Sequence, residues 1–134
     1  MPGETNLDIL IKSMKPELNE GQYIFATFNP GYSFQIPIED ILMVFREKEG
    51  MTLIMSVELA LKHNLKAEIL FSWITLSIHS SLTAVGLTAA FSAALAEKNI
   101  SCNVVAGYYH DHIFVDYKDA EDAMTALLQL STID

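Results

Sequence analysis

The chain has 134 residues, of which 51% are apolar, so it can bury a core as one compact domain or two small halves and is not a disordered segment. Acidic residues outnumber basic ones by 17 to 8, and the net charge of −9 disfavours nucleic acid and anionic membrane surfaces, which bind clustered positive charge. A single cysteine, Cys102, excludes an internal disulfide, and the start MPGETNLDIL lacks the features of a signal peptide, so we expect a cytoplasmic protein.

Spacing of apolar residues predicts the elements of the first part of the chain. They are, in order, a helix over 5–14 capped by Thr5 or Asn6, a strand over 23–28, a hairpin of 43–46 with 51–55, and a short helix over 57–64. Gly50 is expected to supply the positive φ that a short hairpin loop needs. Asn64 is typical of a helix C-terminus.

The second part predicts a strand over 68–79, a helix over 82–99, a hairpin of 101–109 with 112–117, and a last helix over 118–130. Ser80 or Ser81 is expected to cap the helix over 82–99. That helix has small residues and almost no charge outside its apolar face, which indicates a second half or a second chain on its far side. The inner face of the last helix is expected to hold Ala120, Ala123, Met124, Leu127 and Leu128.

One uncharged stretch, residues 69–96, is long enough to be compared with a membrane span. Polar residues interrupt its middle: Ser77, His79, Ser80, Ser81 and Thr83. A strand, a polar turn and a buried helix explain the stretch better than a span does.

The two parts repeat one order of elements, namely strand, excursion, hairpin and helix. This order is most of the βαββαβ plan called ferredoxin-like, an α+β fold whose antiparallel sheet carries helices on one face. We therefore predict two halves, residues 1–66 and 67–134. The pattern leaves the fourth strand of each half unplaced, although residues 67–71 could close the first sheet.

Residues 75–90, TLSIHSSLTAVGLTAA, resemble the first strand, ligand loop and first helix of an ACT domain, and residues 100–115, ISCNVVAGYYHDHIFV, resemble the hairpin that follows. Together they are similar to small bacterial tandem ACT proteins related to the arginine-sensing CASTOR proteins. The resemblance implies regulation by a small effector. Where ACT loops carry Asp and Pro-Gly, this chain has Ser80, Ser81 and Val85-Gly86, which leaves the ligand open.

The loop before the helix is the first candidate site, because a helix N-terminus offers unpaired N–H groups to an anion and Gly86 permits close approach. The resemblance extends the site to the neighbouring strand. The candidate residues are His79, Ser80, Ser81, Thr83, Ala84, Val85, Gly86, Leu87, Asn103 and Val104. The alternative is a capped helix with a packing glycine.

The hairpin tip around His110 and Asp111 is the second candidate, as a ligand contact. A metal site is disfavoured because one tip supplies too few converging ligands, and a polar turn is the alternative. Cys102 lies on an apolar strand, where a lone cysteine is more often core than nucleophile.

The sequence thus favours a non-catalytic tandem ACT protein that binds an amino acid, uses no cofactor and forms a homodimer. A ligand-free interaction or dimerisation module is the alternative. A metal-dependent activity at His110 and His112 ranks last.

Overall fold

The computed structural model describes residues 6–31, 35–78 and 85–132, and its packing divides the chain into two compact units. Unit 1 combines Met1–Glu20 with Ser72–Asp134, and unit 2 is Gly21–Phe71. This division differs from the predicted one along the sequence, because the first twenty residues pack with the C-terminal part of the chain.

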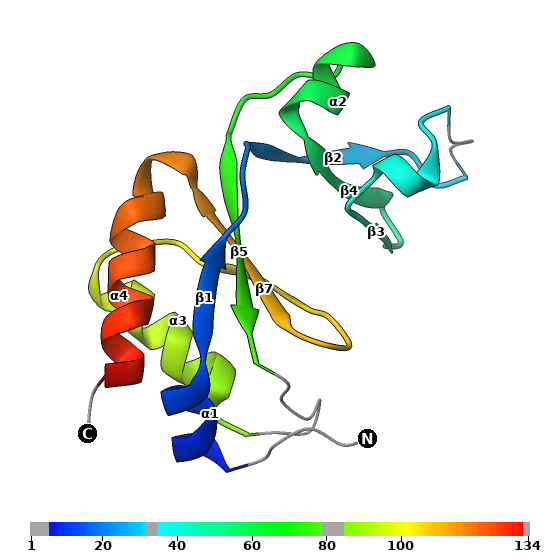
Figure 1. Ribbon diagram of the computed structural model, residues 1–134. Coiled ribbons are helices and arrows are strands. Elements are labelled where there is room, and N and C mark those ends of the chain that lie inside the picture. The colour runs from blue at the N-terminus through cyan, green and yellow to red at the C-terminus, as the bar shows by residue number, and fades with distance from the viewer. Residues whose placement is uncertain (1–5, 32–34, 79–84, 133–134) are drawn as a thin grey trace. The chain divides into compact units, whose positions relative to one another are not determined.

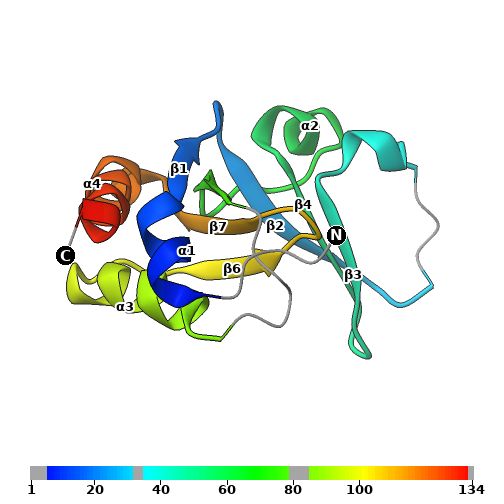
Figure 2. The ribbon, with the colours of Figure 1, turned by 60° about the horizontal axis from the view of Figure 1, so that its bottom comes forward.

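Unit 1 is a sheet with helices on one face (Figures 1 and 2). The strand order is β1 (Lys15–Leu18), β5 (Phe71–Ser77), β7 (Asp111–Asp116), β6 (Asn103–Ala106). The helices are α1 (Leu7–Ser13), α3 (Leu87–Glu97) and α4 (Ala120–Thr132), which follows a short 3-10 turn, η2 (Tyr117–Asp119). α4 packs against α1, α3 and β1.

The strand that the sequence left unplaced in this unit comes from the N-terminus. β1 pairs antiparallel with β5, with Pro16 opposite Leu76 and Glu17 opposite Thr75. β5, α3, β6, β7 and α4 supply strand, helix, strand, strand and helix in chain order, so β1 completes the βαββαβ plan. The expected α+β ferredoxin-like fold is confirmed.

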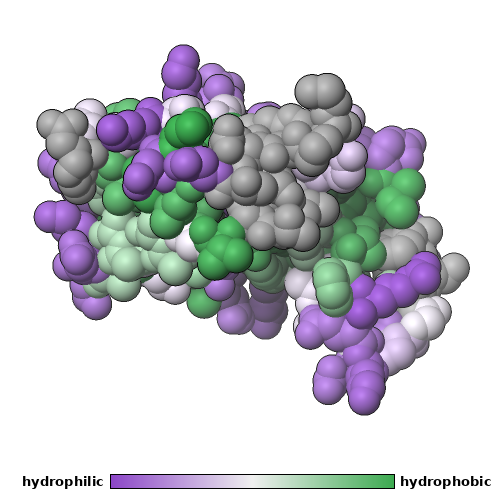
Figure 3. Space-filling view, turned by 90° about the horizontal axis from the view of Figure 1, so that it is seen from below, coloured by the Kyte–Doolittle hydropathy of each residue, from purple (hydrophilic) through white to green (hydrophobic). Residues whose placement is uncertain are grey.

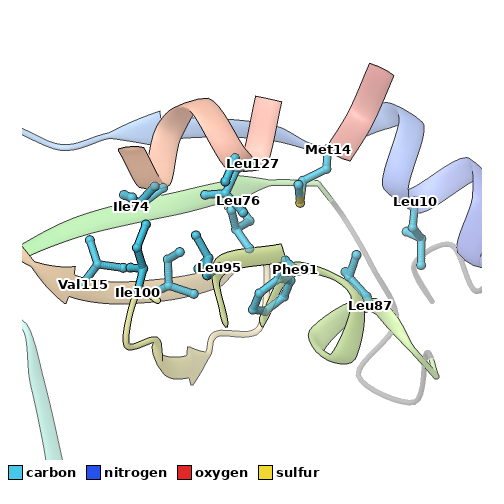
Figure 4. Packing of buried hydrophobic residues seen from close by; sticks show 13 residues of the cluster. Leu10, Met14, Ile74, Leu76, Leu87, Phe91, Leu95, Ile100, Val115 and Leu127 are labelled. Atoms are coloured by element: carbon cyan, nitrogen blue, oxygen red, sulfur yellow. The ribbon is translucent and has the colours of Figure 1, made fainter. Parts of the chain in front are cut away.

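The core of unit 1 lies between the sheet and the helices (Figure 4). Buried side chains from β5, β7, α3, α4 and the α1 segment meet there; they include Leu10, Met14, Ile74, Leu76, Leu87, Phe91, Leu95, Ile113, Val115, Ala123 and Leu127. The predicted inner face of α4 is confirmed at Ala120, Ala123 and Leu127. Leu128 was assigned wrongly, since it is 51% exposed and Ala126 is buried instead.

Unit 2 is a smaller antiparallel sheet with its own core. Its strands run in the order β3 (Met43–Arg46), β4 (Met51–Ser56), β2 (Tyr23–Phe28), and α2 (Val57–Lys62) follows β4. A 3-10 turn, η1 (Ile38–Asp40), stands where unit 1 has a full helix. Tyr23 pairs with Phe71, so the start of β5 borders this sheet on its other side.

Two local expectations are wrong. Gly50 does not have positive φ; it is required because a Cβ there would lie 2.5 Å from the carbonyl oxygen of Phe28. The N-cap of α3 is Gly86, with φ 97°, and not Ser80 or Ser81, because the helix begins only at Leu87.

The other helix ends follow their sequence signals. Asn6 caps α1 by accepting a hydrogen bond from the Ile9 amide at 3.2 Å, and Asn64 ends α2 with φ 58°. Over the described ranges, no helix is long and apolar enough to cross a membrane.

Candidate functional site

The start of α3 is built around Gly86. Its left-handed backbone turns the chain into the helix, and its carbonyl accepts the first helical hydrogen bond from the Ala90 amide at 2.9 Å. A Cβ at Gly86 would lie 2.9 Å from Cδ2 of Leu7, so α1 packs closely here. Val85 is 83% exposed, whereas Leu87 is buried in the core. The predicted site residues His79, Ser80, Ser81, Thr83 and Ala84 lie outside the described ranges.

The tip of the β6–β7 hairpin reaches the end of β5. Within the tip, the Gly107 amide donates to the His110 carbonyl at 2.9 Å. The Nδ1 atom of His110 lies 3.2 Å from the carbonyl oxygen of Ile78. Ile78 is the last described residue before the predicted ligand loop, so this contact joins the hairpin tip to the end of β5.

The other predicted residues divide between the two faces of that sheet. Asp111 alternates with Ile113 and Val115, whose side chains are in the core, so it lies on the helix-covered face. Val104 pairs with Ile113 on the same face. Asn103 pairs with Phe114 on the opposite face, where its amide donates to the Phe114 carbonyl at 3.3 Å. Asn103 therefore does not converge with Asp111.

The carboxyl group of Asp111 is half-buried, and its surroundings shift its pKa. Burial raises the pKa of its carboxyl group, and the nearby charge of His112 partly opposes that rise. The ionised form of Asp111 is therefore disfavoured by desolvation. Shifted pKa values of this kind are common at functional positions.

Sequence reasoning missed a polar cluster on the face of the unit 1 sheet opposite the helices. The indole Nε1 of Trp73 donates to Nδ1 of His112 at 3.0 Å, and Thr75 Oγ1 lies 3.2 Å from the same nitrogen. Asn19 donates to Thr75 Oγ1 at 3.0 Å. The only sequence signal was the alternation of Trp73 with Thr75 on one strand and of His112 with Phe114 on another.

The described residues offer little for metal or thiol chemistry. No three His, Cys, Asp or Glu side chains within the described ranges form a group that could hold a metal ion. Cys102 packs beside the unit 1 core, and burial raises the pKa of its thiol to about 11. A thiol with that pKa carries very little thiolate at neutral pH and makes a poor nucleophile.

Solved structures share this fold. A Vibrio cholerae protein of unknown function, described as a possible transport protein, is 49% identical, with a TM-score of 0.83 over 93% of this chain and 95% of that one. An Agrobacterium protein (14% identity, TM-score 0.68, 88% of this chain and 89% of that one) is similar in fold. The ligand-free regulatory subunit of aspartate kinase from Thermus thermophilus (14% identity, TM-score 0.66) is similar over 88% of this chain and 99% of that one.

No curated protein matches the sequence. Two family profiles do match it, both described as ACT domains, over residues 2–72 and 68–129. These profiles together span nearly the whole chain. The chain belongs to the ACT-domain family and is a tandem ACT protein.

Proposed function

We propose that this protein is a non-catalytic, cytoplasmic regulator that binds an amino acid at the end of the unit 1 sheet. The effector site is formed by the loop from His79 to Leu87 together with the hairpin residues Val104, His110 and Asp111, whereas Asn103, on the opposite face of the sheet, is left out of it. ACT domains are regulatory modules, and the aspartate kinase neighbour is itself named as a regulatory subunit. No cofactor is required.

The observation that carries the proposal is the contact between His110 Nδ1 and the Ile78 carbonyl at 3.2 Å. It supports a site made jointly by the tip and the loop, because the residue next to the loop is tied to the tip. The half-buried carboxylate of Asp111 supports it further, since that group suits the amino group of a ligand better than it suits a protein core.

Thermal denaturation against the twenty amino acids at millimolar concentration tests this function. A ligand that binds only the folded chain at a hundred times its Kd adds about 2.7 kcal/mol to the free energy of unfolding. For a chain of this length that is a rise in Tm of roughly 10 °C. We expect such a rise with one or two amino acids, and no rise with any of them would contradict the proposal.

A matched pair of variants locates the site. Gly86→Ala and Gly21→Ala each place a side chain at positive φ, +97° and +93°, so both lose stability through backbone strain. Gly21 belongs to unit 2, whereas the proposed site is built from residues of unit 1. We expect Gly86→Ala to abolish the ligand-induced rise in Tm and Gly21→Ala to keep it. An equal rise in both variants would move the site elsewhere.

A ligand-free dimerisation module is the second candidate, favoured by the outer face of α3. Ala89, Ala93 and Ala96 lie on one exposed face at helical spacing, and Figure 3 shows pale hydrophobic surface gathered over this helix. We propose that this face joins two copies as a homodimer. Ala93→Glu is expected to reduce the mass measured by light scattering to that of one chain, whereas Thr125→Glu on the exposed face of α4 is not. A wild-type chain that is already monomeric would contradict the homodimer.

A further inference from the structure

The side chain of His112 is held between two strands by hydrogen-bond donors. It projects from β7 on the face opposite the helices, and its Nδ1 atom lies 3.0 Å from Trp73 Nε1 and 3.2 Å from Thr75 Oγ1, both on β5. The His112 and Trp73 rings are also in contact, with centroids 5.7 Å apart. The hairpin is thereby fastened to β5 by side chains close to its tip.

Asn19 is hydrogen-bonded to both residues that contact His112, and the indole of Trp73 fixes the role of Nδ1. Its side-chain amide donates to Thr75 Oγ1 at 3.0 Å and to the Trp73 carbonyl at 3.1 Å. The Thr75 hydroxyl accepts from Asn19, so its own proton is available for His112. An indole N–H is a donor only. Nδ1 of His112 therefore must be an acceptor, and the imidazole is neutral with its proton on Nε2.

Protonation of His112 is incompatible with this arrangement. An imidazolium carries N–H on both nitrogens, so Nδ1 would face the indole N–H of Trp73 donor to donor. Trp73 would lose its hydrogen bond to the ring, and Thr75 would have to turn its hydroxyl proton away and accept from the ring instead. Gly107 lies next to the Nε2 side of the ring, where a Cβ would come within 3.2 Å of that atom.

Charged side chains lie near His112 on the hairpin itself and on β1. His110 and Asp111 lie beside it on the hairpin, and burial together with the charge of His110 lowers its pKa against the opposing effect of Asp111. On β1, two strands away, Glu17 and Lys15 share its face through their partners Thr75 and Ser77. The described part of β5 and β6 contributes no ionised side chain to this face.

We propose that His112 is a proton-operated latch, which when neutral fastens the hairpin tip to β5 and when protonated releases it. The tip carries His110 and Asp111, so release also weakens the contact of His110 with Ile78. The latch regulates the hairpin of the effector site, and that consequence rests on the proposed function, whereas the latch itself needs no effector.

The sign of the effect follows from the direction of the pKa shift. The pKa of His112 is lower in the folded chain than its ordinary value of 6.5. Neutral His112 therefore contributes its full stabilisation to the folded chain above pH 6.5. That stabilisation is lost as the pH falls through the lowered pKa of the folded state.

The chain contains a reporter for this event, because Trp73 is its single tryptophan. Its indole N–H gives one resonance in a ¹⁵N-labelled sample, and its fluorescence is quenched by an adjacent imidazolium. Titration of the full-length, effector-free chain from about pH 8 to pH 5 is expected to shift that resonance and reduce the fluorescence through one midpoint below 6.5. The amide resonances of Tyr108, Tyr109 and His110 are expected to move with the same midpoint.

Two variants make the test specific. His112→Gln keeps an oxygen acceptor for Trp73 but does not titrate, so the transition is expected to disappear. His110→Gln is the matched control: its transition is expected to persist with a higher midpoint, because the charge of His110 lowers the pKa of His112. An unchanged indole signal in the wild type, or the same transition in His112→Gln, would overturn the latch.

Effector binding gives a separate readout. If only the latched state binds, affinity falls about tenfold for each pH unit below the midpoint. Affinity that stays constant while the indole titrates would overturn the link to the site and leave the proposed function standing. A titrating indole in a chain that binds no amino acid would overturn the proposed function and support the latch.

Discussion

The thiol of Cys102 is kept unreactive by its position beside the core of unit 1. Burial raises its pKa from 9.0 to about 11, so at pH 8 the folded chain holds roughly a hundredfold less thiolate than an exposed cysteine would. We expect iodoacetamide to alkylate the folded chain about a hundred times more slowly than the urea-unfolded chain, as followed by intact mass. Equal rates would show that the thiol is exposed or activated.

Asp111 is expected to stabilise the fold less than a neutral side chain would. Its pKa is higher in the folded chain than the ordinary value of 3.8. The protonated form therefore contributes to the free energy of unfolding below pH 3.8, and this contribution is lost as the pH rises through the raised pKa. At neutral pH, Asp111→Asn should therefore raise the free energy of unfolding, by less than about 1 kcal/mol because solvent still screens the group. Urea denaturation measures this change.

A control distinguishes this effect from a general loss of negative charge. Asp122 is an exposed carboxylate in the first turn of α4, where it favours the helix N-terminus, so Asp122→Asn should cost a few tenths of a kcal/mol. A loss of stability in Asp111→Asn would mean that the carboxylate has a stabilising partner. If Asp111→Asn gains stability and also loses the ligand-induced rise in Tm, Asp111 serves binding at the expense of the fold.

The residue types at the candidate site could be read from the sequence, but their pairing could not. Gly86 was singled out because glycine permits close approach of a backbone or ligand, and Asp111 because a carboxylate at a hairpin tip suits a ligand contact or a turn. The hydrogen bond between Trp73 and His112 joins residues 39 positions apart. It depends on β5 and β7 being neighbours on the sheet, and a residue pattern along one strand carries no information on that.

Among the elements, the β3–β4 hairpin shows how a correct prediction can rest on a wrong reason. The sequence indicated the hairpin from Gly50, and the hairpin is present, but Gly50 is needed for space and not for its φ. Gly50→Ala would place Cβ 2.5 Å from the backbone oxygen of Phe28, which a side-chain rotation cannot relieve. We expect a loss of about 1–3 kcal/mol in the free energy of unfolding, measured by chemical denaturation.

Glu49→Ala in the same turn is the control for that substitution. Glu49 is exposed, so its replacement should change the free energy of unfolding by no more than about 0.5 kcal/mol. Similar losses in the two variants would mean that the turn, and not the contact with β2, limits the stability of the hairpin.

Periodicity predicted most of the elements and failed for β1. β2, β3, β4, β7 and the α2 and α4 helices lie close to their expected ranges, and β4, β7 and α4 bury regular apolar faces. β1, with the sequence KPEL, holds a proline and two charges and buries only Pro16. Its strand conformation comes from pairing with β5, a contact that only the folded chain provides.

For the molecule as a whole, the two packing units are interleaved along the chain, because Gly21–Phe71 stands in the sequence between the two segments of unit 1. Unit 1 needs residues from both ends, because β1 pairs with β5 and Leu10 and Met14 are buried in its core. The predicted division between residues 66 and 67 followed the repeat of elements along the sequence. Such a repeat gives the order of elements within each half. It cannot show that β1, which completes the sheet of unit 1, comes from the chain segment before unit 2.

Interleaving predicts which fragments fold. Residues 67–134 alone lack β1 and α1, so one edge of β5 is unpaired and the core loses Leu10 and Met14; we expect this fragment to show poorly dispersed amide resonances and no cooperative melting. A permuted chain of residues 72–134, a flexible Gly/Ser linker and residues 6–20 restores the order β5, α3, β6, β7, α4, β1. It should melt cooperatively and show dispersed resonances. If residues 67–134 fold as well as the permuted chain, β1 and α1 are dispensable additions to a unit that is complete without them.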